Sequence, residues 1–152
     1  MKITPYTPDD LDNVTALFRA YSKSIGVDLA YQDFETELAG LPGKYAPPYG
    51  ALLIARDGDA AVGCVALRKS AEGICEMKRL YVAQAARGTG LGWKLVEAII
   101  AEGRALGYGE IRLDTLPTML DALGLYKALR FEATAPYYDT PIKGTVFLSL
   151  KL

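Results

Sequence analysis

The sequence contains no histidine among its 152 residues and only two cysteines. The absence of histidine excludes Ser/His and Cys/His nucleophilic pairs, His-bearing metal sites and the commonest general base. Cys64 and Cys75 lack the C-x-x-C spacing of metal and redox motifs, which favours two buried thiols in a reducing compartment. Acid–base chemistry must therefore come from carboxylates, tyrosine, lysine or cysteine.

The sequence also lacks a large net charge and long apolar runs. The 17 Lys and Arg residues nearly balance the 18 Asp and Glu residues, and they are scattered along the chain, so we expect no nucleic-acid partner. No run of about 18 residues is apolar throughout, and the first residues lack the apolar core of a signal peptide, so we expect no membrane partner and a cytoplasmic location. With 51% hydrophobic residues, the composition predicts one globular domain over residues 1–152.

Hydrophobic periodicity predicts alternating helices and strands. Helices are expected from Thr7 and Pro8 onward and over 33–39, 91–106 and 117–129, and strands over 52–55, 60–67, 74–82, 110–114, 132–138 and 145–151. The first three strands should form an antiparallel meander, and the helix over 91–106 makes a crossover that places the next strand parallel to strand 74–82. The fold class is therefore α/β, with a mixed sheet flanked by helices.

A glycine-rich loop lies between an apolar strand and an amphipathic helix. Its residues are Arg87, Gly88, Thr89, Gly90, Leu91 and Gly92. Glycines let the backbone approach a ligand, and free amides at a helix start bind anions, so the loop predicts a phosphate-bearing cofactor. A turn that only packs the helix on the strand is the alternative. The loop has neither the Gly-Lys-Ser/Thr of a P-loop nor the G-x-G-x-x-G of a dinucleotide site.

Two segments together resemble the GNAT superfamily of N-acetyltransferases. The strand over 75–82 and its following loop match the family signature at Arg87, Gly90 and Gly92. A second match, to the family's A-x-x-L-Y-x-x-L-G-F helix end, is carried by Ala122, Leu125, Tyr126, Leu129 and Phe131, with Arg130 where glycine is usual. The resemblance covers about residues 50–152. It implies an acyl-CoA N-acyltransferase fold in which the parallel strand pair splays apart.

The resemblance also implies acetyl-CoA as cosubstrate, with no metal. The amides of the loop from Arg87 to Gly92 would hold the pyrophosphate. The free backbone groups of Leu80, Tyr81 and Val82 would pair with the pantetheine arm, because its amides need backbone partners. An amide near Leu80 would also stabilise the oxyanion.

Two side chains are expected to carry proton transfers. Glu76 matches the glutamate that serves as general base in some family members, and a surface salt bridge with Lys78 is the alternative, since strand alternation places both on one face with Leu80. Tyr126 aligns with the tyrosine that protonates the departing thiolate in many members, and a core aromatic is its alternative. A covalent acyl-cysteine is rejected because no histidine can activate a thiol.

The acceptor is expected to be a primary amine of a small molecule or peptide, attacked directly. Its site would be built from the first two helices and the last hairpin, where Tyr31, Tyr45, Tyr49, Tyr137 and Tyr138 gather in the sequence. Core packing or contacts in a homodimer explain these tyrosines equally well. The alternative function is a non-catalytic acyl-CoA-binding or sensing module of the same fold.

Overall fold

The computed structural model, which describes residues 1–152, contains one seven-stranded sheet in the order β1-β2-β3-β4-β5-β7-β6. The strands are β1 (Lys2–Pro5), β2 (Ala51–Asp57), β3 (Ala60–Ala71), β4 (Ile74–Val82), β5 (Glu110–Thr115), β6 (Glu132–Ala133) and β7 (Val146–Lys151). The helices are α1 (Leu11–Ile25), α2 (Phe34–Ala39), α3 (Leu91–Ala105) and α4 (Leu120–Ala128).

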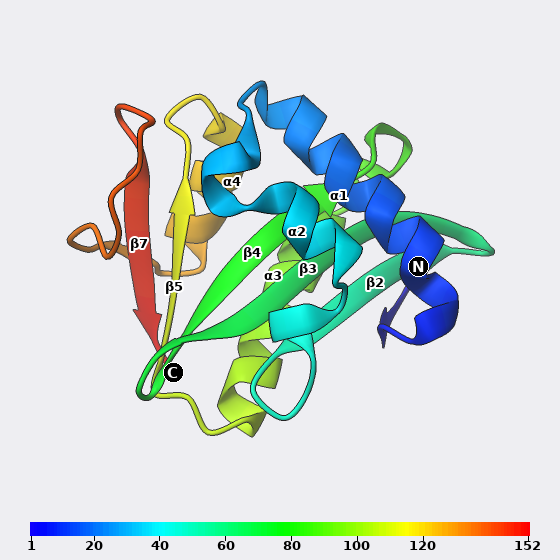
Figure 1. Ribbon diagram of the computed structural model, residues 1–152, viewed down its shortest axis with the longest axis horizontal. Helices are drawn as coiled ribbons and strands as arrows, with labels where there is room; N and C mark the ends of the chain where they lie inside the picture. Colours follow the sequence, from blue (N-terminus) through cyan, green and yellow to red (C-terminus); the bar gives the residue numbers. More distant parts are fainter.

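Helices cover both faces of the sheet. Helices α1 and α2 lie in front of it in Figure 1, and α3 and α4 lie behind it. The larger buried core, of 19 residues, joins the sheet to α3 and α4, and a smaller one, of 11 residues, lies under α1 and α2. The sheet face under α1 and α2 also carries buried charged side chains, among them Glu76, Lys78 and Arg79. None of the helices combines the length and the apolar composition that a membrane span requires.

The antiparallel meander of β2, β3 and β4 confirms the sequence prediction. Its turns contain Gly58 and Gly73, whose backbone φ angles of 61° and 74° suit glycine. The parallel pairing of β4 with β5 is also confirmed, but it spans only Ile74–Glu76 against Glu110–Arg112. Beyond that point the two strands diverge, as Figure 1 shows. The predicted splay of the parallel pair is therefore present.

A β-bulge in β4 corrects the predicted strand alternation. The pairing of β3 with β4 shifts register between Cys64 and Ala66, and Arg79 adopts a left-handed φ of 60°. Before the bulge, Met77 packs into the α3 core; after it, Leu80 does so. Glu76 and Leu80 therefore face opposite sides of the sheet, contrary to the expectation from a regular strand.

Two further differences lie at the ends of the chain. The sequence prediction missed β1, a short edge strand paired with β2. It also extended a strand through Tyr138, whereas β6 ends at Ala133. Pro136 has no amide to donate to a ladder, and the rings of Tyr137 and Tyr138 both pack on Phe147. These contacts turn the segment into a loop over the sheet.

Candidate active site

A groove of about 860 Å³ runs along the end of β4, the glycine loop and the start of α4. It brings together eight of the residues that the sequence assigned to the cofactor: Leu80, Tyr81, Val82, Arg87, Gly88, Gly90, Leu91 and Gly92. Thr89 does not line the groove. Its hydroxyl donates a hydrogen bond of 2.6 Å to the carbonyl of Ala86, which closes the turn before α3.

The amides at the start of α3 are free. The six consecutive backbone N–H groups from Gly88 to Trp93 donate no hydrogen bond within the chain. Gly90 is the N-cap, with a φ of 81° that a residue with a side chain adopts only at a cost. Unpaired amides at the positive end of a helix dipole attract anions. This end of the groove therefore suits a pyrophosphate.

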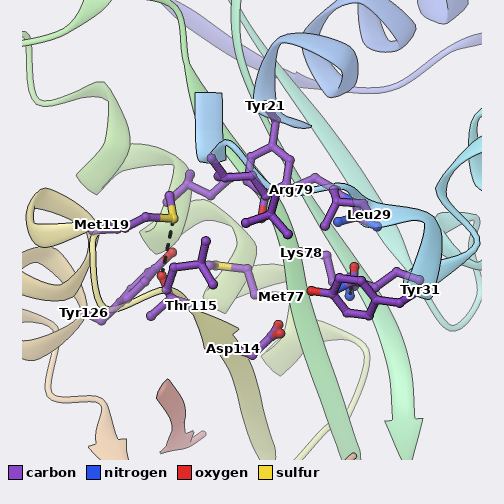
Figure 2. Close-up of a pocket in the computed structure, with 16 residues that line it drawn as sticks. Tyr21, Leu29, Tyr31, Met77, Lys78, Arg79, Asp114, Thr115, Met119 and Tyr126 are labelled. Carbon is purple, nitrogen blue, oxygen red and sulfur yellow. Dashed lines mark hydrogen bonds between the residues drawn. The ribbon is translucent and has the colours of Figure 1, made fainter. Parts of the chain in front are cut away.

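A small cavity of about 50 Å³, which we call the chamber, lies where β4 and β5 diverge. In Figure 2, Tyr126 and Met119 border it on one side and Tyr31 on the other, and Asp114 lies between them. The chamber shares Tyr21, Leu80, Met119 and Ala122 with the groove. The splay of the sheet thus connects the cofactor groove to the opposite face.

Tyr126 is almost fully buried and projects from α4. Its ring packs against Phe131, with ring centroids 5.6 Å apart, and burial raises the pKa of its hydroxyl. The phenol therefore keeps its proton at neutral pH, as a proton donor must. The same burial fits the alternative of a core aromatic, so packing alone does not separate the two interpretations.

Glu76 is 1% exposed and both of its oxygens are occupied. Oε1 accepts a hydrogen bond of 3.0 Å from Nε of Arg68, and Oε2 accepts one of 2.7 Å from the hydroxyl of Tyr137. Lys78 Nζ lies 4.0 Å from Oε2. Glu76 therefore belongs to a buried ion-pair network, and it does not line the chamber.

Asp114 is the carboxylate that does line the chamber. Its Oδ2 accepts a hydrogen bond from the hydroxyl of Tyr138, whereas Oδ1 has no partner in the chain. Lys78 lines the same chamber, donates to Gln32 Oε1 at 3.1 Å, and has a pKa lowered by burial, an effect that the charge of Glu76 partly offsets. The sequence analysis missed Asp114, because only the register of β5 places it at this opening.

An open cleft of about 300 Å³ continues from the chamber on the α1–α2 face. It shares Tyr31, Gln32, Lys78 and Arg79 with the chamber. Three of the five tyrosines that the sequence analysis assigned to the acceptor site line this cleft: Tyr31, Tyr137 and Tyr138. Tyr45 is instead buried against Phe18, and Tyr49 is 63% exposed outside the cleft.

Arg79 has a structural role in this region. Its guanidinium forms two hydrogen bonds with the carboxylate of Glu37, of 2.9 and 3.0 Å, and lies over the ring of Phe34. This buried pair holds α2 against the bulge of β4 and so fixes one wall of the cleft.

The two thiols lie away from the chemistry. Cys64 and Cys75 have no exposed surface, and neither lines the groove, the chamber or the cleft. Burial raises the pKa of each thiol to about 12. The prediction of buried thiols is confirmed. No group of three or more Cys, Asp or Glu side chains is arranged to hold a metal ion.

Comparison with known proteins agrees with this architecture. Residues 13–131 match the Acetyltransferase (GNAT) family. An uncharacterized N-acetyltransferase of Schizosaccharomyces pombe is 45% identical over 147 residues, which are 95% of this chain and 90% of the relative. An uncharacterized N-acetyltransferase of Dictyostelium discoideum is 29% identical, with 95% of each chain covered.

Solved structures give the same result for the fold. A Klebsiella pneumoniae protein described as a candidate acyl-CoA N-acyltransferase is 31% identical, with a TM-score of 0.73 and coverage of 99% of this chain and 97% of that chain. A Salmonella typhimurium protein solved with its cofactor acetyl-CoA is 20% identical, with a TM-score of 0.74 and coverage of 99% and 92%. The resemblance drawn from the sequence motifs is confirmed.

Proposed function

Because the chain belongs to the acetyltransferase (GNAT) family, we propose that it transfers an acetyl group from acetyl-CoA directly to the primary amine of a small molecule or peptide. The single observation that carries this proposal is the adjacency of three spaces, each of which shares lining residues with the next: the groove with free amides, the chamber with Tyr126, and the polar cleft. Such an arrangement would let two substrates approach each other from opposite faces of the sheet.

The residues of the groove fit the cosubstrate. When bound, acetyl-CoA supplies an activated thioester carbonyl. The amides of Gly88 to Trp93 would bind its pyrophosphate, and the stretch of β4 beyond the parallel ladder would offer backbone groups to its pantetheine arm. A Cβ at Gly92 would make ordinary van der Waals contacts with Leu125 and Val82, which line the same groove, so glycine leaves that space open to the cofactor.

Tyr126 would donate a proton to the departing thiolate. It borders the chamber together with Leu80, and its phenol is protonated at neutral pH. The amide of Leu80 or its neighbour would stabilise the negative charge that develops on the carbonyl oxygen. The amine nitrogen would form its bond to the carbonyl carbon, and the carbon–sulfur bond would break.

The attacking amine must first lose a proton, and Glu76 was the expected base. In the folded chain Glu76 would act through the hydrogen bond that it accepts from Tyr137, a residue of the cleft wall. Glu76 itself lines the cleft, and we therefore retain it as a residue that supports deprotonation there.

A direct experiment tests the proposed function. Titration calorimetry with acetyl-CoA should show binding, and a thiol-release assay with amines, amino acids, polyamines and short peptides should show turnover for at least one class. Acetyl-pantetheine, a truncated cofactor that lacks the pyrophosphate, should bind much more weakly, because the free amides lose their partner. Binding of acetyl-CoA without thiol release across the whole panel would favour a sensing module over an enzyme.

A further inference from the structure

The polar cleft carries more positive than negative charge at its floor. Arg68, Glu76 and Arg112 form one row across β3, β4 and β5, because Glu76 is the register partner of both arginines. In the next row, Lys78 lies on β4 and Asp114 on β5. The three cations outnumber the two carboxylates, and Arg79 is already neutralised by Glu37.

The two arginines of this row have N–H groups that form no hydrogen bond within the chain. Arg68 uses only Nε on Glu76, and its side chain is 33% exposed. Arg112 donates through Nε and Nη2 to the hydroxyl of Ser70, at 2.9 and 2.7 Å, and its guanidinium lies 4.0 Å from the ring centroid of Tyr137. Nη1 of Arg112 and both Nη atoms of Arg68 have no partner within the chain. Guanidinium groups held in place with free N–H groups are suited to a planar anion such as a carboxylate.

The chamber contains a negatively charged group, the carboxylate of Asp114. Asp114 has a free oxygen there, and its other oxygen is held by Tyr138. A cationic amino group would find its counter-charge at Asp114, beside the point where Tyr126 and Leu80 border the same chamber. Asp114 lies two residues from Arg112 on the same strand, so both side chains face the same side of the sheet. Their Cα atoms are about 7 Å apart.

We propose that the acceptor is a compact zwitterion of the amino acid type, with its amino group at Asp114 in the chamber and its carboxylate at Arg112 and Arg68 in the cleft. This inference rests on the proposed function and names the substrate class of that same site. A polyamine would place a second cation against Arg68, Arg112 and Lys78, where like charges repel. Asp114 binds the ammonium and is placed to receive its proton before the nitrogen forms the amide bond.

The test compares matched acceptors. The thiol-release assay is run with the common amino acids, with the corresponding carboxamides, with the decarboxylated amines and with a polyamine. A carboxamide keeps the amine and the side chain but loses the negative charge, and its ammonium gives up a proton more readily than that of the free amino acid. Any preference for the amino acid must therefore come from recognition of the carboxylate. We expect kcat/KM for the best amino acid to exceed that of its carboxamide by roughly 10-fold to 100-fold.

Variants locate the recognition. Arg112→Gln should lower kcat/KM for the amino acid roughly 10-fold and leave the carboxamide almost unchanged, whereas Arg19→Gln, which removes an exposed arginine of α1 outside the cleft, should change neither. Asp114→Asn should lower kcat/KM for both acceptors. Far-UV circular dichroism and the affinity for acetyl-CoA report whether each variant is folded.

The outcomes separate the two proposals. Equal or faster turnover of carboxamides or polyamines in the unaltered protein would overturn the zwitterion inference and leave the proposed acetyltransferase function standing. An Arg112→Gln protein that keeps its full preference for the carboxylate would also overturn it. Tight binding of acetyl-CoA with no turnover of any acceptor would instead overturn the proposed function itself.

Discussion

The proposed cofactor groove and the proposed acceptor cleft are built from different parts of the chain. The groove is lined mainly by two short segments, around 80–93 and 118–125, together with Tyr21 and Ser24 of α1. The cleft is formed by side chains from β3, β4, β5, the segment around α2 and the loop after β6. A site made of backbone amides requires glycines followed directly by a helix start, so it can be recognised as a motif in the sequence. A site made of side chains requires only that residues from distant segments lie on one face of the sheet, so no sequence motif marks it.

The two regions also differ in how their polar groups are satisfied. In the groove, six consecutive amides have no partner within the chain. In the cleft, most polar groups are already paired, and Glu76 is bound on both oxygens. The groove thus offers free amides to a proposed cofactor. In the cleft most polar groups hold one another in place, and only a few N–H donors there, with one oxygen of Asp114 in the chamber, are free to contact a proposed acceptor.

The largest effect is expected where the two regions meet. Tyr126→Phe should lower kcat by roughly 10²-fold to 10⁴-fold, because the thiolate loses its proton donor, with little change in the affinity for acetyl-CoA. Steady-state kinetics and calorimetry on the same preparation measure both quantities. The ring still packs against Phe131, so stability should hold. Wild-type turnover in this variant would reduce Tyr126 to a core aromatic.

The next effect breaks the groove and spares the cleft. Gly90→Val should weaken acetyl-CoA binding by roughly 10-fold to 100-fold, because a β-branched residue cannot keep the left-handed backbone that orients the amides. Gly58→Val is the matched control: it carries the same backbone cost, about 1 to 2 kcal/mol, in the turn between β2 and β3, which does not line the groove. Calorimetry should show a loss for the first variant alone. Equal affinities would mean that the loop amides do not bind the cofactor.

A third change breaks the cleft and spares the groove. Glu76→Gln should lower the free energy of unfolding by about 3 kcal/mol, because Arg68 and Lys78 lose a buried counter-charge. Turnover should fall as well, whereas the affinity for acetyl-CoA should remain. Glu72→Gln removes a carboxylate that is 96% exposed and should change stability by less than about 0.5 kcal/mol. Urea unfolding measures the contrast, and equal midpoints would show that the Glu76 network does not hold the cleft.

The smallest effect concerns groups in neither region. Burial raises the pKa of Cys64 and Cys75 to about 12, so the folded protein keeps two protons that the unfolded chain releases above about pH 9. Their contribution to stability is complete below about pH 9 and is lost as the pH rises toward 12, at about 1 kcal/mol for each thiol by pH 10. Urea midpoints on either side of pH 9 measure this loss. A thiol reagent at pH 8 should label neither residue until urea is added; rapid labelling of the native protein would reopen the acyl-cysteine route.

Several structural features were predictable because they depend on local patterns. Strand alternation and turn glycines predicted the meander, and the crossover helix predicted the parallel pair of β4 and β5. The glycine loop predicted the groove. Other features were not predictable. Nothing local signals that Arg79 adopts a left-handed conformation, yet this bulge reverses the face of every residue after it in β4. Likewise, the rings of Tyr137 and Tyr138 replace a predicted strand with a loop through contacts to Phe147.

By itself, the sequence determined the backbone part of this protein: the helix start with free amides, the strand before it and the position of Tyr126, because these depend on residues that are neighbours in the chain. Only the tertiary structure decided which side chains share the cleft. The register of three strands brings Arg68 and Arg112 to either side of Glu76, and the divergence of two strands opens the chamber beside Asp114. Register is a property of paired strands, so no single segment of the sequence contains it.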